Sequence, residues 1–292
     1  MTNALPRISI IIPIYQHWEL TVVLFDALHE QTLSKELWEC FIVDNGSDQV
    51  PAQSELPDFV TLLECPIPGS YAARNKGLKN AKGELLVFTD ADCKPQPDWL
   101  ERLWKGYQQQ SQPQLIAGGV TVKRFGPGTP NAIETYDIAM GLPQSRYIRR
   151  GYAVTANLSI PRSVFDAIGH FDDQRFSGGD AEICQRAAAS GFTLTYLPDA
   201  EVLHPARDSW EELITKLKRQ KGGQVRSGPK KRRLKFIIKT MIPPVWLFWY
   251  ALRSDKITAR QKITALRVQT LLWLMELAET ARLLANGKLE RR

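Results

Sequence analysis

Short apolar runs alternate with amphipathic stretches along roughly the first 110 residues of the chain. The runs are rich in β-branched and aromatic residues, as in strands that are buried on both faces, and they cover residues 8–15, 38–48, 59–65 and 84–92. The stretches between and after them are predicted to be helical, and they cover residues 18–31, 69–81 and 97–109. This alternation predicts an α/β fold with a mostly parallel, Rossmann-like sheet flanked by helices.

The second half of the chain has a more mixed pattern. It predicts a strand with a glycine pair at 115–125, a strand followed by a helix within 151–173, and a helix at 178–192. Residues 193–204 are predicted to form two short strands that are broken at Pro198. From Trp210 the composition becomes helical and then basic, so we expect one domain over residues 1–215 and a C-terminal helical region over residues 216–292.

Polar side chains gather where the predicted strands end. Tyr15 follows the first strand, Asp44 ends the second, and Asp90 and Asp92 follow the apolar part of the fourth. The carboxyl ends of strands in an open parallel sheet form the edge at which ligands bind. The sequence therefore predicts a ligand site at this edge.

Asp90 and Asp92 stand one residue apart, so on a continuing strand their side chains point the same way and repel each other. One interpretation is a solvated acidic turn, which is a common feature. The other is a site for a divalent cation, because carboxylate oxygens suit Mg²⁺ or Mn²⁺.

Composition and charge narrow the class of protein. The chain has 292 residues, 43% of them hydrophobic and 24% charged, which is typical of a globular protein. The net charge is +7, yet residues 216–239 alone hold eleven Lys or Arg and no acid, so the rest of the chain is net negative. The basic stretch lacks an accompanying nucleic-acid-binding fold, and a nucleic-acid partner is not favoured.

The cysteines and the N-terminal residues indicate the cellular compartment of the protein. Cys40, Cys65, Cys93 and Cys184 are scattered and form no C-x-x-C pair, which argues against a disulfide framework or zinc knuckle and favours a reducing cytosol. The N-terminal apolar run is short, is broken by Pro13, and lacks the features of a signal peptide. We expect it to be the first strand.

The C-terminal region combines the basic stretch with an aromatic, uncharged segment at 240–252. This segment contains Pro243-Pro244 and is shorter than the roughly 20 residues of a membrane-spanning helix. We therefore expect it to lie on an anionic membrane surface, with Trp246, Trp249 and Tyr250 at headgroup depth.

A long helix is predicted over about 258–285, with one mainly apolar stripe and an end at Asn286-Gly287. Packing on the first domain and pairing in a homodimer are the alternatives for this stripe.

Six motifs occur in order over residues 7–205: "SIIIPIYQ", "FIVDNGSD", "GSYAARNKGLKNAKGELLVFTDAD", "ANLSIPRSVFDAIGHFDD", "GGDAEICQRAAASGF" and "YLPDAEVLH". In this series the chain resembles the family 2 glycosyltransferases. The resemblance implies the GT-A fold and transfer of a sugar from a nucleotide-sugar donor to an acceptor, with inversion at the anomeric carbon.

The resemblance implies a role for each polar residue at the sheet edge. Asp92 would contact the metal, and Asp90 would share the metal site nearer the donor sugar or ribose. Asp44 matches the residue that contacts the donor's base, and the alternative is that it caps the Asn45-Gly46 turn. Pro13 and Tyr15 match the loop that packs around the nucleotide, with ordinary strand termination as the alternative.

Three further positions carry implied roles. Arg74 and Asn75 match the "R-N" at the start of the family's helix, where a cation faces the donor phosphates. A surface arginine is the alternative for Arg74, and a structural residue that fixes the loop is the alternative for Asn75. His204 matches a position that joins the metal shell in relatives, and a structural histidine is the alternative.

Asp180 is implied as the general base that accepts the proton of the acceptor hydroxyl. A helix N-cap is a compatible role for the same side chain. Relatives usually have Glu-Asp here, whereas this chain has Gly179-Asp180, so the contribution of the motif's Glu is missing. Glu182 is implied as a supporting residue or as an acid in the first helical turn.

The leading hypothesis is a metal-dependent inverting glycosyltransferase, peripheral on the cytoplasmic face of the cell membrane, with a glycolipid or surface-polysaccharide precursor as acceptor. A catalytically weak GT-A module that binds a nucleotide-sugar as a scaffold is the alternative, and Gly179 favours it. A nucleotidyltransferase ranks third, since "PIYQHWEL" lacks a glycine-rich phosphate loop. Specificity for donor and acceptor is expected in loops around 125–150.

Overall fold

The computed structural model describes residues 5–175, 177–226 and 228–285. The chain divides into two compact units. The first, here called the sheet unit, comprises Met1–Thr121, Leu142–Gln174 and Gly179–His204. The second, here called the helical unit, comprises Val122–Gly141, Arg175–Gly178 and Pro205–Arg292.

One sheet runs through the first unit, in the order β3-β2-β1-β4-β7-β6-β8-β5. Its strands are β1 (Ile8–Ile14), β2 (Trp38–Asp44), β3 (Val60–Glu64), β4 (Leu85–Phe88), β5 (Lys94–Pro95), β6 (Leu115–Lys123), β7 (Leu158–Pro161) and β8 (Leu194–Pro205). The pairs of β1 with β2, β1 with β4 and β2 with β3 are parallel, while β7 pairs antiparallel with both β4 and β6. The predicted parallel half is thus confirmed.

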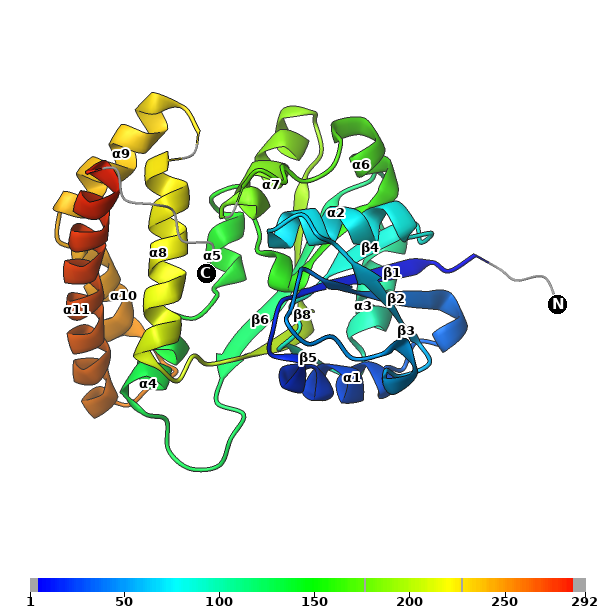
Figure 1. Ribbon diagram of the computed structural model, residues 1–292, viewed down its shortest axis with the longest axis horizontal. Helices are drawn as coiled ribbons and strands as arrows, with labels where there is room; N and C mark the ends of the chain where they lie inside the picture. The colour runs from blue at the N-terminus through cyan, green and yellow to red at the C-terminus, as the bar shows by residue number, and fades with distance from the viewer. Residues whose placement is uncertain (1–4, 176, 227, 286–292) are drawn as a thin grey trace. The chain divides into compact units, whose positions relative to one another are not determined.

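The sheet is covered by helices on both faces (Figure 1). Its helices and 3₁₀ turns are η1 (Trp18–Leu20), α1 (Thr21–His29), η2 (Lys35–Leu37), η3 (Gln53–Glu55), α2 (Ser70–Asn80), α3 (Trp99–Gln108), α5 (Gln144–Ile148), η4 (Thr155–Asn157), α6 (Arg162–Ile168) and α7 (Gly179–Ala189). One core packs the sheet against α2, α6 and α7, and the other packs it against α1 and α3. Ile10 and Ile12 of β1 belong to the second core while Ile11 belongs to the first, so both faces of this strand are buried.

The glycine pair of β6 has a packing reason. A Cβ on Gly118 would lie 2.2 Å from Asn157 Nδ2, and one on Gly119 would lie 2.3 Å from the carbonyl oxygen of Pro198. Asn157 is fully buried, donates to the carbonyls of Gly119 and Ala200, and accepts from Trp99 Nε1. The two glycines therefore leave room for an amide that ties the sheet together.

Two expectations about the second half of the chain were wrong. β8 is one continuous strand, Leu194–Pro205, that runs through Pro198, and not two short ones, because the fixed φ of proline is compatible with extended backbone. The stretch around 125–150 also contains helices, α4 (Ala132–Met140) and α5, in place of the expected loops.

The helical unit consists of α4, α8 (Trp210–Arg226), α9 (Lys230–Met241), α10 (Val245–Arg253) and α11 (Ala259–Leu284). Ile133, Leu217 and Leu272 belong to a small core that joins α4, α8 and α11. Thr258 caps α11 and accepts from the N–H of Gln261, which confirms the predicted long helix. Its predicted end at Asn286-Gly287 lies outside the described residues.

Pro243 and Pro244 separate α9 from α10, because proline lacks the N–H that would continue a helix. Among the helices that the structure describes, none has both the length and the apolar character needed to cross a bilayer.

Candidate active site

The strand register brings the predicted polar residues to one edge of the sheet unit. Ile14 pairs with Asp44 across β1 and β2, and Ile11 pairs with Phe88 across β1 and β4. Because these strands are parallel, Tyr15, Asp44 and the segment after Phe88 leave the sheet on the same side.

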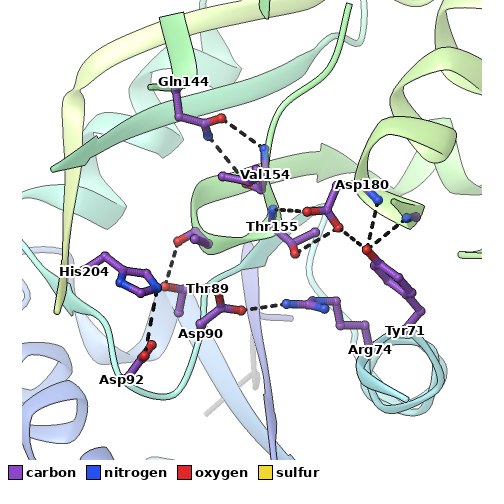
Figure 2. A network of polar contacts seen from close by, with 12 residues as sticks. Tyr71, Arg74, Thr89, Asp90, Asp92, Gln144, Val154, Thr155, Asp180 and His204 are labelled. Carbon is purple, nitrogen blue, oxygen red and sulfur yellow. Dashed lines mark hydrogen bonds and ion pairs between the residues drawn. The ribbon is translucent and has the colours of Figure 1, made fainter. Parts of the chain in front are cut away.

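Asp92 follows the end of β4, His204 is the last residue but one of β8, and their side chains lie together (Figure 2). The distance from Asp92 Oδ2 to His204 Nε2 is 3.9 Å, which is too long for a direct hydrogen bond. The Sγ of Cys93 lies within 4.8 Å of ligand atoms of both residues. Burial, and then the charges of Asp92 and Asp90, raise the pKa of the Cys93 thiol, so this sulfur keeps its proton at neutral pH.

These residues fit a divalent cation. Asp92 Oδ1 is buried and has no hydrogen-bond partner among the residues that the structure describes. Leaving a buried carboxylate oxygen unpaired is costly, so its position is explained if it faces a ligand. A carboxylate and an imidazole at this spacing are the donor types that hold Mn²⁺ or Mg²⁺ in combination with phosphate oxygens.

Asp90 is paired with a buried arginine and not with the other aspartate. Arg74 Nη2 donates to Asp90 Oδ1 over 2.7 Å, and the Arg74 side chain is 4% exposed. This excludes a surface arginine at position 74. The pair also explains how two carboxylates are tolerated close together, since a fixed positive charge lies beside one of them.

Asp44 caps the Asn45-Gly46 turn, which is the alternative role that the sequence offered. Its Oδ2 accepts from the N–H groups of Gly46 and Ser47, over 2.9 and 3.0 Å, which is the turn-capping role. Its Oδ1 is buried and has no hydrogen-bond partner in the described part of the chain. One oxygen therefore holds the turn and the other is available to a ligand at the sheet edge.

The loop after β1 has an unusual backbone. Gln16 and His17 have φ values of 55° and 53°, a left-handed conformation that residues other than glycine adopt rarely. Gln16 is held by its backbone N–H, which donates to Ser47 Oγ, and by its side-chain amide, which donates to Asp48. The β1 loop that carries Tyr15 is thereby fixed to the loop that Asp44 caps.

Asp180 lies in the first turn of α7 and accepts hydrogen bonds from other elements (Figure 2). Its Oδ1 accepts from the Tyr71 hydroxyl over 2.8 Å and from Thr155 Oγ1 over 3.3 Å. Its Oδ2 accepts from the Thr155 N–H over 3.3 Å. Both oxygens of this carboxylate are therefore oriented by the protein.

Two of the predicted site residues, Glu182 and Asn75, form hydrogen bonds with residues that are not part of the predicted site. Both oxygens of Glu182 accept from Arg186, over 2.8 and 3.0 Å. The Asn75 amide donates to the Phe171 carbonyl and accepts from the Phe171 N–H. These contacts favour the structural alternative for Asn75, and they occupy Glu182 within its own helix.

The sequence did not point to Tyr71, Thr155 or Cys93. Tyr71 precedes Arg74 by three residues on α2, so both side chains lie on one helix face toward the site. This spacing from Arg74 is the feature of the sequence that could have identified Tyr71. Thr155 is placed by the η4 turn, which local sequence did not indicate.

The polar edge of the sheet thus carries one carboxylate with an unpaired buried oxygen and a second carboxylate that the protein orients in the first turn of a helix. A family model described as glycosyl transferase family 2 matches residues 9–172. The chain belongs to this family and is a glycosyltransferase.

Relatives with curated names agree with this assignment. Glycosyltransferase AglE of Haloferax volcanii is 34% identical over 232 residues, which cover 77% of this chain and 75% of AglE. Pre-mycofactocin glycosyltransferase of Mycobacterium tuberculosis is 27% identical over 218 residues, which cover 68% of this chain and 45% of that protein.

Solved structures share the fold. The mannosyltransferase PcManGT from Pyrobaculum calidifontis, in complex with GDP-Man and Mn²⁺, has a TM-score of 0.61 at 16% identity and covers 98% of this chain and 89% of its own. TarS 1-349 of S. aureus, in complex with UDP-GlcNAc, has a TM-score of 0.55 at 13% identity and covers 97% of this chain and 93% of its own. The predicted GT-A fold is confirmed.

Proposed function

We propose that the chain is a metal-dependent, inverting glycosyltransferase in which Asp92 and His204 hold the cation and Asp180 is the general base. The observation that carries this proposal is the contrast between the two carboxylates. Asp92 has one buried oxygen without a hydrogen-bond partner among the described residues, and its other oxygen lies 3.9 Å from Nε2 of His204. Both oxygens of Asp180, in contrast, are oriented by protein donors.

Asp92 and His204 would hold Mn²⁺ or Mg²⁺, with Asp90 beside them. When bound, the cation neutralises charge on the diphosphate that leaves with the nucleoside. Asp90 is kept in place by Arg74, whose buried guanidinium adds positive charge next to the donor. Asp44 Oδ1 would accept a hydrogen bond from the donor's base or ribose.

The transfer is a single displacement. The oxygen of the acceptor hydroxyl forms a bond to the anomeric carbon of the donor sugar, and Asp180 takes the hydroxyl proton. The bond between that carbon and the diphosphate oxygen breaks with its electron pair, so a nucleoside diphosphate leaves. Attack opposite the leaving group inverts the configuration at the anomeric carbon.

The surface of the helical unit supports a membrane-associated acceptor. Leu234, Ile238 and Ile242 along α9 are each more than half exposed, and they line a groove with Lys231, Lys235 and Lys239. Large exposed apolar side chains in a contiguous patch need a partner. A row of apolar residues edged by lysines suits the boundary between the headgroups and acyl chains of an anionic bilayer.

The aromatic segment forms the next helix, α10. Trp246 and Trp249 are 39% and 49% exposed, as expected of side chains that rest at headgroup depth. The chain would thus work as a peripheral protein on the cytoplasmic face of a membrane, where a glycolipid or a lipid-linked polysaccharide precursor is presented. The basic residues attract that surface by about 1 kcal/mol each.

A panel of nucleotide sugars tests the proposed reaction. UDP-glucose, UDP-N-acetylglucosamine and GDP-mannose are incubated with the full chain in Mn²⁺ or in EDTA, and release of the nucleoside diphosphate is followed. We expect turnover of at least one donor in Mn²⁺ and its loss in EDTA. Equal turnover in EDTA would contradict the role of the metal. Binding of a donor with Mn²⁺ but without any turnover would indicate a catalytically weak module.

A further inference from the structure

Gly179 and Tyr71 occupy the same space at the start of α7. A Cβ placed on Gly179 would lie 2.6 Å from Cζ of Tyr71 and less than 3 Å from both neighbouring ring carbons. Such distances are well inside van der Waals contact, so a side chain at position 179 and this tyrosine ring exclude each other. The glycine that interrupts the family's Glu-Asp pair is therefore required by a residue 108 positions earlier in the chain.

The Tyr71 hydroxyl fills the site that this glycine opens. It accepts from the N–H of Gly179 over 2.9 Å and from the N–H of Asp180 over 3.3 Å. It donates its own proton to Asp180 Oδ1 over 2.8 Å (Figure 2). One phenol thus satisfies free N–H groups of the first turn of α7 and fixes the carboxylate that follows them.

The tyrosine is itself rigid. It is 6% exposed, and its ring stacks on Phe171 at a centroid distance of 5.7 Å. The guanidinium of Arg74 lies 5.7 Å from the same ring, on the side of the helix that leads to Asp90. Burial, and then the charge of Asp180, raise the pKa of Tyr71 far above its usual range, so the hydroxyl keeps its proton and remains a donor.

We propose that Tyr71 is the positioning residue for the catalytic base of this enzyme, and that Gly179 is the residue that admits it. The inference rests on the proposed role of Asp180. Tyr71 sets the direction of Asp180 Oδ1, and the Thr155 N–H sets that of Oδ2, so the carboxylate presents a fixed face to the acceptor hydroxyl.

The variant Tyr71→Phe tests this inference, because it keeps the stacked ring and removes the hydroxyl alone. Hydrolysis of the nucleotide sugar that the wild-type chain turns over fastest in Mn²⁺ is measured as kcat and KM. We expect kcat to fall by about 10- to 100-fold, the loss of one charge-assisted hydrogen bond, with KM for the donor unchanged. A purely structural tyrosine would instead lower thermal stability and leave kcat of the folded enzyme intact.

Two controls separate this inference from the proposed function. Tyr107→Phe removes a hydroxyl from α3, away from Asp180, and should leave kcat at the wild-type value. Asp180→Asn should lower turnover by about 10²–10⁴. Normal turnover by Asp180→Asn would overturn the proposed base and the inference with it. An inactive Asp180→Asn together with a fully active Tyr71→Phe would overturn the inference alone.

The pairing with Gly179 has its own test, which needs no substrate. Gly179→Ala should lower the midpoint of thermal unfolding in the wild-type background, because the methyl group meets the Tyr71 ring. In a Tyr71→Leu background, where the far half of the ring is gone, the same substitution should cost little or nothing. Equal losses in both backgrounds would show that the two positions are independent, and the proposed pairing would be wrong.

Discussion

Two carboxylates in the sheet unit differ in how the protein treats them. Asp180 receives three hydrogen bonds from Tyr71 and Thr155, which leave neither of its oxygens without a protein donor. Asp92 has one buried oxygen without a partner among the described residues and an imidazole nitrogen 3.9 Å from the other. The protein thus orients the first carboxylate and leaves one oxygen of the second unpaired among the described residues.

The difference follows from the chemistry that each carboxylate would perform. A general base must present a lone pair in a fixed direction, so donors that hold it are useful. A cation ligand must direct at least one lone pair at the metal, so the position that the metal would take cannot be occupied by a protein donor. Substituting Asp180 should therefore reduce turnover and leave nucleotide binding intact. Substituting Asp92 should instead remove the Mn²⁺-dependent binding of the nucleotide.

The largest effect is expected for Asp180→Asn. The amide has the shape of the carboxylate but cannot accept the proton, so turnover should fall by about 10²–10⁴. Binding of UDP or GDP with Mn²⁺ should remain at the wild-type level. Steady-state kinetics and calorimetry on the same preparation measure both quantities, and near-normal turnover would move the base elsewhere, with Glu182 as the next candidate.

A smaller effect is expected for Arg74→Met. This change leaves the Asp90 carboxylate without the buried positive charge beside it, so its repulsion with Asp92 is no longer offset. Binding of a nucleoside diphosphate in Mn²⁺ should therefore weaken by about 10-fold or more. The matched control is Arg102→Met, which removes the same guanidinium from an exposed ion pair with Asp98 on α3. Calorimetry should show normal binding by the control, and equal losses in both variants would remove the special role of Arg74.

The membrane surface is tested by charge and salt. Arg232 and Arg233 donate to backbone carbonyls of α8, so they are left intact. Replacing the exposed Lys230, Lys231 and Lys235 with Gln should reduce sedimentation with anionic phosphatidylserine vesicles by at least several-fold, because each lysine near the surface contributes about 1 kcal/mol. Salt should weaken wild-type binding without abolishing it, because Trp and Leu contacts are not screened.

The matched control replaces three exposed lysines of the sheet unit, Lys79, Lys82 and Lys94, with Gln. It changes the net charge equally and should not affect vesicle binding. A wild-type chain that stays in solution with anionic vesicles at low salt and runs as a discrete dimer would mean that the apolar surface is a subunit interface.

The smallest expected effect concerns Lys216. Burial, and then the charge of Arg207, lower the pKa of the Lys216 ammonium to about 8, although Asp137 opposes the shift. Between this value and the ordinary lysine pKa this group binds more protons in the unfolded chain than in the folded chain, so its own contribution to stability rises with pH in that window. The buried thiols of Cys40, Cys93 and Cys184 have raised pKa values and contribute in the opposite direction. The test is therefore a comparison with Lys216→Met: from about pH 8 to about pH 9.5 the midpoint of thermal unfolding of the wild-type chain should gain a few degrees relative to that variant.

The sequence predicted the parts of the fold that depend on local pattern. β1, β2 and β4 are continuous apolar runs, and their buried faces follow directly from that character. The polar residues at their ends were found because parallel strands share one edge. The predicted break at Pro198 was wrong because the pairing of neighbouring strands decides whether a proline is tolerated within a strand. That pairing is a property of the sheet and not of the local sequence.

The candidate site was predictable where a motif carries it and not where contacts come from far along the chain. Asp90, Asp92 and Asp180 are visible in the sequence as acids at strand and helix ends. Tyr71 lies 109 residues from Asp180, and only the packing of α2 against α7 shows that the two side chains meet. Gly179 was interpreted as the loss of a motif residue, and its contact distances instead reveal a site occupied by another side chain.

The central claim is that the cation site and the base are separate carboxylates. Calorimetric titration of UDP and GDP into the wild-type chain, Asp92→Ala and Asp180→Asn, each in Mn²⁺ and in EDTA, tests it most directly. We expect Mn²⁺-dependent binding by the wild-type chain and Asp180→Asn, and none by Asp92→Ala. Undiminished Mn²⁺-dependent affinity in Asp92→Ala would contradict it.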